Sequence, residues 1–100
     1  MARITTVYWR DIPAQVIGGA GRRAAKHPLS ERFEQAIDRA AMRSGASETD
    51  AYLADWRKVA EEVEGDEAEA ARLRAETLEA EWTEDRLKAV AMAGGREDAA

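Results

Sequence analysis

The side chains best suited to bind a charged ligand surround a glycine-rich segment near the start of the chain. Gly18, Gly19 and Gly21 are followed at once by Arg22 and Arg23. Backbone amides in such loops can form a concave anion site, and two arginines can clamp a phosphate or a carboxylate. The segment lacks the Gly-Lys-Ser/Thr ending of a P-loop and the third glycine of a dinucleotide fingerprint. We therefore favour the alternative interpretation, a solvated turn between two short strands.

A second polar group follows directly on two aromatic residues, in the order Tyr8-Trp9-Arg10-Asp11. Aromatic residues beside arginine are typical of interface anchors. Neighbours in a strand point to opposite faces, so Arg10 and Asp11 should not pair with each other. For the same reason, one of Tyr8 and Trp9 should be in the core and the other at the surface. The candidate contacts with a ligand or partner are Trp9, Arg10, Asp11, Arg22, Arg23 and Lys26.

Catalytic and metal-binding patterns are not apparent in this sequence. There is no cysteine, which excludes disulfides, thiolate metal sites and cysteine nucleophiles. His27 is the single histidine, and we expect it to be exposed in a loop. The acidic run over residues 61–69 lacks the alternating ligands and turn glycine of a calcium loop, and it is interpreted as a solvated helix start. We expect no catalytic residue, no metal and no cofactor.

Charge is divided unevenly along the 100 residues. Residues 1–43 hold eight basic and four acidic side chains, whereas residues 44–100 hold seven and sixteen, and the net charge is −5. Phosphate repels such a chain, so we expect no nucleic-acid partner. The basic half suits an acidic partner, unless the two halves complement each other within one fold.

Membrane and export signals are also missing from the sequence. No apolar run approaches the roughly 20 residues that a membrane-spanning helix needs. The N-terminus lacks the apolar stretch of a signal peptide. We therefore expect a cytoplasmic protein that does not bind a membrane.

The elements that would position the basic half are short strands. Residues 3–9 are rich in β-branched and aromatic types and predict a strand that ends near Pro13. Residues 14–17 form a short apolar run that should pair back on the first strand. Residues 22–27 predict a third strand, closed by Pro28.

Helices are predicted after this sheet. Ser30 is a suitable N-cap for the first helix, and Gly45 is a suitable residue to end it. The sequence Ser47-Glu48-Thr49-Asp50 resembles a capping box and predicts a second helix that continues to about Val63. Its apolar face would consist of Tyr52, Leu53, Trp56, Val59, Ala60 and Val63.

Two further helices complete the prediction. One runs from about Asp66 to Trp82, and a shorter one follows a Thr83 cap and ends at Gly94. Large apolar residues are expected in the core, among them Met42, Leu53, Trp56, Val59, Leu73 and Trp82. Strands followed by helices predict an α+β fold: a small N-terminal antiparallel sheet of two or three short strands, then three or four α-helices. We expect one domain over residues 3–93 and a flexible tail over 94–100.

Two N-terminal segments resemble a bacterial virulence-factor domain family: Tyr8-Trp9-Arg10-Asp11-Ile12-Pro13 within residues 7–17, and the segment from Gly21 to Lys26. Residues 29–42 and 52–56 are similar to the same family, so the resemblance covers about residues 3–90. The family takes its name from a larger protein, conserved virulence factor C, in which a related domain occurs. The family assigns no catalytic residue. The resemblance therefore implies an accessory protein, with a link to folate- and corrinoid-dependent one-carbon enzymes.

The function expected from these observations is that of a non-catalytic interaction module. Its partner would be a protein, and a second copy of the chain is one candidate. The alternative is a small protein that binds a phosphate or carboxylate through the glycine loop with Arg22 and Arg23. In either case, we expect the working surface between Tyr8 and Lys26.

Overall fold

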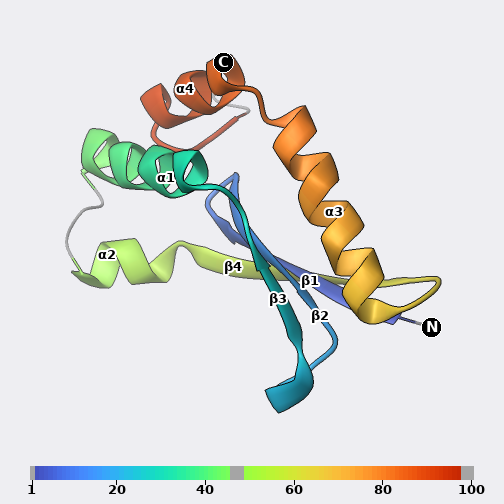
Figure 1. Ribbon diagram of the computed structural model, residues 1–100. Helices are drawn as coiled ribbons and strands as arrows, with labels where there is room; N and C mark the ends of the chain where they lie inside the picture. Colours follow the sequence, from blue (N-terminus) through green and yellow to red (C-terminus); the bar gives the residue numbers. More distant parts are fainter. Residues whose placement is uncertain (1, 46–48, 98–100) are drawn as a thin grey trace.

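A four-stranded antiparallel sheet forms the framework of the protein (Figure 1). The computed structural model describes residues 2–45 and 49–97. The strands lie in the order β3 (Ala25–Pro28), β2 (Ile12–Gly18), β1 (Ala2–Trp9) and β4 (Trp56–Val63). The β1–β2 pair shifts register between Val7 and Tyr8, whereas β1 and β4 pair without interruption along all eight residues. The predicted α+β class is confirmed.

The fourth strand is the main correction to the prediction. The helix expected to continue to Val63 is only α2 (Thr49–Ala54), and the chain then enters β4. Trp56, Val59 and Val63 have helical spacing, but two of them are β-branched and suit a strand equally well. The edge of β1 that does not face β2 can pair with all eight residues of β4. This tertiary pairing makes residues 56–63 a strand and not a continuation of the helix. Ser47 and Glu48 of the predicted capping box lie outside the described residues, so this part of the prediction is untested.

The third strand is real but begins later than predicted. Gly19 and Gly21 have φ angles of 82° and 74°, so the chain turns sharply after β2. A short 3₁₀ turn, η1 (Gly21–Arg23), follows, and β3 begins only at Ala25. Pro28 is the last residue of β3. It is tolerated there because β3 is an edge strand, where a residue without an N–H breaks no ladder.

The other three helices agree with the prediction: α1 (Glu31–Ser44), α3 (Glu67–Glu81) and α4 (Glu84–Met92). Gly45 adopts the left-handed conformation that ends α1. The side chains of Asp66 and Thr83 accept hydrogen bonds from the amides of Glu69 and Arg86, and they cap α3 and α4. Among residues 2–45 and 49–97, no helix combines the length and the apolar character needed to cross a bilayer.

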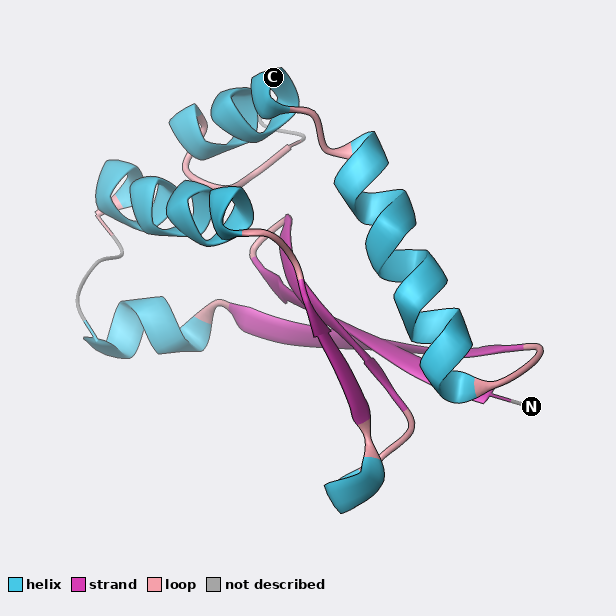
Figure 2. Ribbon diagram, in the orientation of Figure 1, coloured by secondary structure: helices cyan, strands magenta, loops and turns pink. Residues whose placement is uncertain are grey.

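The helices cover the sheet unequally. α1 and α4 pack against each other near the β1–β2 turn, and α3 crosses β2, β3 and β1 (Figure 2). One core joins these elements, with Trp9, Ile12 and Phe33 among its least exposed side chains. Trp82 is buried as predicted, and Trp56 packs only partly against the core. Four predicted core residues are instead between 44% and 73% exposed: Met42, Leu53, Val59 and Leu73.

Candidate functional site

The turn between β1 and β2 places Arg10 and Asp11 in two separate contact sets. Arg10 has a φ angle of 54°, and its guanidinium lies 3.0 Å from the Asp55 carboxylate. It also donates to the Gly94 carbonyl at 2.8 Å. Asp11 lies 3.6 Å from the Arg57 guanidinium. Arg10 and Asp11 therefore do not pair with each other, as predicted, and both hold the turn against later segments.

Trp9, a predicted surface contact, is an interior residue. Its side chain is 0% exposed, and its indole N–H donates to the Tyr52 carbonyl at 2.8 Å. The ring stacks against Tyr52 with centroids 5.8 Å apart. Tyr8 is half-buried, so Trp9 is the core residue of the pair and Tyr8 is the more exposed one. Because α1, α2 and the C-terminal glycines all pack near Trp9, no partner can reach it in this fold.

The predicted tail from residue 94 begins with ordered contacts. The Asp11 amide donates to the Gly95 carbonyl at 2.9 Å. A Cβ at Gly95 would press against the Trp9 ring, so a glycine is needed for this close approach. Residues 94–97 therefore pack on the β1–β2 turn, and residues 98–100 lie outside the described part of the chain. The domain boundary remains a prediction.

The glycine loop and its arginines lie at the other end of β2. Seven residues of strand separate Arg22 from Asp11, a span of roughly 20 Å. A Cβ at Gly18 would overlap the Glu67 carbonyl oxygen. Gly19 lies beside the Glu67 carboxylate, which accepts a hydrogen bond from the Arg3 amide at 3.2 Å. The first two glycines thus make room for the start of α3, and Arg22 and Arg23 extend exposed from η1.

Lys26 and His27 lie in β3, beside α3. They border a groove of about 570 Å³ together with Arg72 and Glu79. The prediction that His27 is exposed in a loop is wrong. His27 lies in a strand and is half-buried, and its Nε2 atom is buried without a hydrogen-bond partner among the described residues. α3 covers this residue, and the helical periodicity of α3 did not reveal which strand it would cross.

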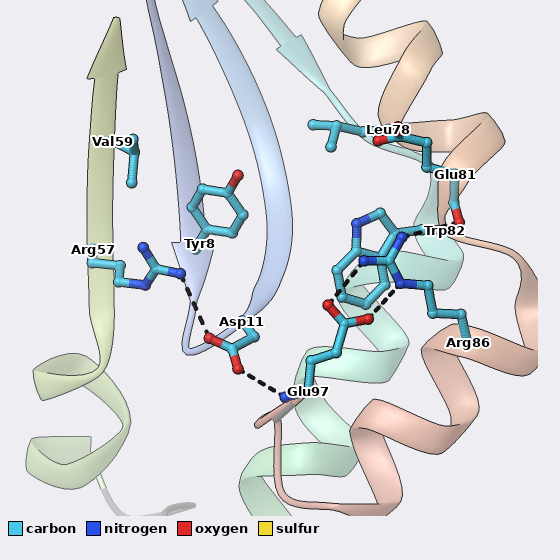
Figure 3. Close-up of a pocket in the computed structure, with 9 residues that line it drawn as sticks. All are labelled: Tyr8, Asp11, Arg57, Val59, Leu78, Glu81, Trp82, Arg86 and Glu97. Atoms are coloured by element: carbon cyan, nitrogen blue, oxygen red, sulfur yellow. Dashed lines mark hydrogen bonds and ion pairs between the residues drawn. The ribbon is translucent and has the colours of Figure 1, made fainter. Parts of the chain in front are cut away.

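A cleft of about 560 Å³ opens between the β1–β4 side of the sheet and the junction of α3 and α4 (Figure 3). Two arginines stack on aromatic rings in this cleft. Arg57 lies 4.5 Å above the Tyr8 ring, and Arg86 lies 3.9 Å above the Trp82 ring. Val59 from β4 also borders the cleft. The cleft has the aromatic walls and convergent charges that are typical of ligand sites.

Both arginines of this cleft are already paired with carboxylates of the chain. The Glu97 carboxylate accepts hydrogen bonds from Nε and Nη2 of Arg86, the latter at 2.9 Å. The Glu97 amide donates to Asp11 at 2.7 Å, and Asp11 faces Arg57. The hydrogen bond from Arg86 lowers the pKa of Glu97. This network closes the C-terminal segment over the cleft, and a ligand would have to displace it.

A second concave site lies on the opposite face of the sheet. It has a volume of about 610 Å³ and is lined by Val7, Gln15, Trp56, Arg57 and Lys58. We call this site the open-face hollow. Val7 pairs with Gln15 on β2 and with Lys58 on β4, so these side chains form a row across three strands. Ile4, three residues before Val7, faces the α3 side together with Gly18. Strand alternation therefore turns Val7 away from α3.

The open-face hollow differs from the cleft in its charge. None of its lining residues is acidic, and no ion pair joins Lys58 to a described residue. The sequence did not indicate this site, because its Trp56 and Lys58 were assigned to a helix. The aromatic and basic types in residues 56–58 were the available signal. Among the described residues, no group of three or more His, Asp or Glu is placed to hold a metal ion.

Comparison with known proteins places the chain in a family. No curated protein and no solved structure matches it significantly. The model of one family, described as Virulence factor, matches residues 7–91. This match covers most of the chain, including the β1–β2 turn, β4, helices α1 to α3 and α4 up to residue 91. The protein therefore belongs to the Virulence factor family, as its N-terminal segments indicated.

Proposed function

We propose that this protein is a non-catalytic interaction module whose open-face hollow binds an acidic segment of a partner protein. The observation that carries the proposal is an apolar hollow bordered by a lysine that has no acidic partner in the described chain. In the cleft, by contrast, each arginine already has a carboxylate. A surface with unused binding capacity is the better candidate for recognition.

The chemistry of the open-face hollow suits a protein segment. Trp56 is half-buried, and tryptophan is enriched among the residues that dominate binding energy at interfaces. Val7 forms an apolar floor, and Lys58 at the rim attracts a carboxylate. A partner segment with one apolar side chain flanked by Asp or Glu complements these features. The charge pairing would favour rapid and selective association.

The identity of the partner is a second part of the proposal. The family resemblance implies an accessory role beside a folate- or corrinoid-dependent one-carbon enzyme. An acidic surface segment on such an enzyme would satisfy the chemistry of the open-face hollow. The alternative, an anion bound by Arg22 and Arg23, is supported only by the exposure of both side chains, because Glu67 already lies beside the neighbouring glycines.

Site-specific photo-crosslinking in the native host tests the proposal. A photoreactive residue replaces Gln15, inside the hollow, and in a matched control it replaces Asp85, which is exposed on α4. Mass spectrometry then identifies the attached peptides. We expect an adduct at position 15 that carries an acidic peptide and is lost in the Lys58→Glu background.

Two results would contradict the proposal. One is equal capture at positions 15 and 85; the other is an adduct at position 15 that survives Lys58→Glu. A captured protein that is not a one-carbon enzyme would refute the link to that metabolism and leave the binding site standing.

A further inference from the structure

The outer edge of β4 is long, regular and exposed. β4 has eight residues and pairs with β1 without a bulge, and it contains no proline. Its six central residues, 57–62, are all exposed. In the described part of the chain, no strand pairs with its outer side. Such an edge presents unpaired backbone groups to any strand that matches it.

The hydrogen bonds of β1 show which backbone groups of β4 point outward. The Arg3 carbonyl accepts from Gly19, beyond the end of β2, whereas the Arg10 amide donates to Asp55, just before β4. Odd residues of β1 therefore bond toward β2, and even residues bond toward β4. Thr6 pairs with Val59, so Val59 bonds inward.

The outward backbone groups of β4 follow from this alternation. They belong to Trp56, Lys58, Ala60 and Glu62. These four residues can bond to a further antiparallel strand without disturbing the ladder to β1.

We propose that β4 pairs with β4 of a second copy of this chain, in an antiparallel ladder centred on Val59. A twofold axis normal to the sheet then places Lys58 opposite Ala60 of the second copy and Trp56 opposite Glu62 of that copy. These pairs use the four outward residues of each strand. The two sheets join into one of eight strands. The inference concerns the edge of β4, and it does not rest on the open-face hollow.

The order of charges in β4 favours a second copy over an unrelated strand. Arg57 and Lys58 come first, and Glu61 and Glu62 follow. Antiparallel pairing reverses this order, so Arg57 faces Glu61 of the second copy. Opposite charges directly across a ladder stabilise the pair, and like charges destabilise it. Edges that resist association commonly carry lysines or other charges that repel a copy.

The surrounding structure leaves space for the second copy. α3 packs over β1, β2 and β3 and leaves Val59 44% exposed. Pairing of the two Val59 side chains would bury this surface. Arg74 already forms an ion pair with Glu61, so the contact with Arg57 of the second copy would extend an existing network. An edge-to-edge interface of this length is small, and we expect a weak, concentration-dependent dimer.

Cysteine crosslinking tests the register. The chain has no cysteine, so each variant carries a single thiol. In the proposed ladder, the two Val59 residues form a non-hydrogen-bonded pair with Cα atoms about 4.5 Å apart, within disulfide range. Val59→Cys should form a disulfide-linked dimer on mild oxidation. Leu53→Cys, at an exposed apolar residue of α2, is the matched control and should remain monomeric. Faster crosslinking by Ala60→Cys than by Val59→Cys would refute the register.

Analytical ultracentrifugation of the wild-type chain, which has no cysteine, over a series of concentrations tests the association itself. The wild-type chain should dimerise reversibly. Ala60→Pro removes one outward N–H and should abolish dimerisation while the circular dichroism spectrum stays unchanged. A wild-type chain that remains monomeric throughout, or an Ala60→Pro variant that dimerises normally, would overturn the proposal. Ala60 does not line the open-face hollow, so the crosslink from position 15 should persist in Ala60→Pro, which separates the two proposals.

Discussion

The two edges of the sheet differ in how well they are protected against pairing with a further strand. β3 has four residues, ends in Pro28 and lies beside α3, with which it forms a groove. β4 has twice that length, contains no proline and has no helix packed over its centre. A short, covered edge with a proline resists further pairing, whereas a long, regular edge invites it. The comparison indicates that association, if it occurs through the sheet, occurs at β4.

The difference extends to the side chains beneath each edge. On the β3 side, α3 approaches so closely that Gly18 must lack a Cβ and the Nε2 atom of His27 is left without a partner. On the β4 side, Lys58 and Ala60 remain exposed. The β3 side of the sheet is thus tightly packed against α3, whereas the β4 edge is exposed to solvent. Substitutions at matched positions should therefore have unequal effects.

The largest expected effect concerns the direction of the amides in β4. Val59→Pro removes an N–H that bonds inward to β1, and its ring clashes with that strand. We expect a loss of about 3 kcal/mol in the free energy of unfolding. Ala60→Pro removes an outward N–H and should cost much less. Urea denaturation of both variants measures the difference, and equal losses would show that the assigned alternation is wrong.

A second comparison adds side-chain volume near each edge. Gly18→Ala brings a Cβ into the backbone of α3 and should cost about 2 kcal/mol, because neither backbone can yield easily. Ala60→Val adds β-branched bulk on an exposed strand residue and should change stability by less than about 0.5 kcal/mol. Thermal unfolding of the two variants checks this contrast. A tolerated Gly18→Ala would mean that α3 can move away from β2.

The smallest effect concerns the ion pair that closes the cleft next to β4. The pKa of Glu97 is lower in the folded chain than its ordinary value of 4.5, chiefly because Arg86 donates to it. Its contribution to stability is therefore complete above that value and is lost as the pH falls through the lowered pKa. Glu97→Gln should cost less than about 1 kcal/mol at neutral pH, because the pair is partly exposed.

Urea denaturation at a series of pH values provides the measurement for Glu97. The wild-type chain and Glu97→Gln should converge in stability under acid conditions. A difference between them that is independent of pH would refute the assigned role of the carboxylate.

Local signals in the sequence were sufficient for most of the helices and for the first strands. Asp66 and Thr83 cap the helices that follow them, and Gly45 ends α1, because capping depends on neighbouring backbone groups. Ser30 precedes α1 as predicted, but its hydroxyl donates to Glu79 and does not cap the helix. The β-branched and aromatic run over residues 3–9 predicted β1 for a similarly local reason. Arg10 and Asp11 were predicted as contacts with a ligand or partner, and in the fold they tie the turn to Asp55 and Arg57. Their partners lie more than 40 residues away, and no local pattern marks them.

Sequence patterns alone were enough to predict the α+β class, the family, the approximate ends of α1, α3 and α4, and the uneven division of charge. The strand over residues 56–63 depends on tertiary pairing, because the apolar spacing of this segment fits either a helix or a strand, and β1 offers it a pairing edge. The same pairing created the open-face hollow and the exposed edge of β4. Both candidate surfaces thus arise from contacts between segments about 50 residues apart, which local propensity does not encode.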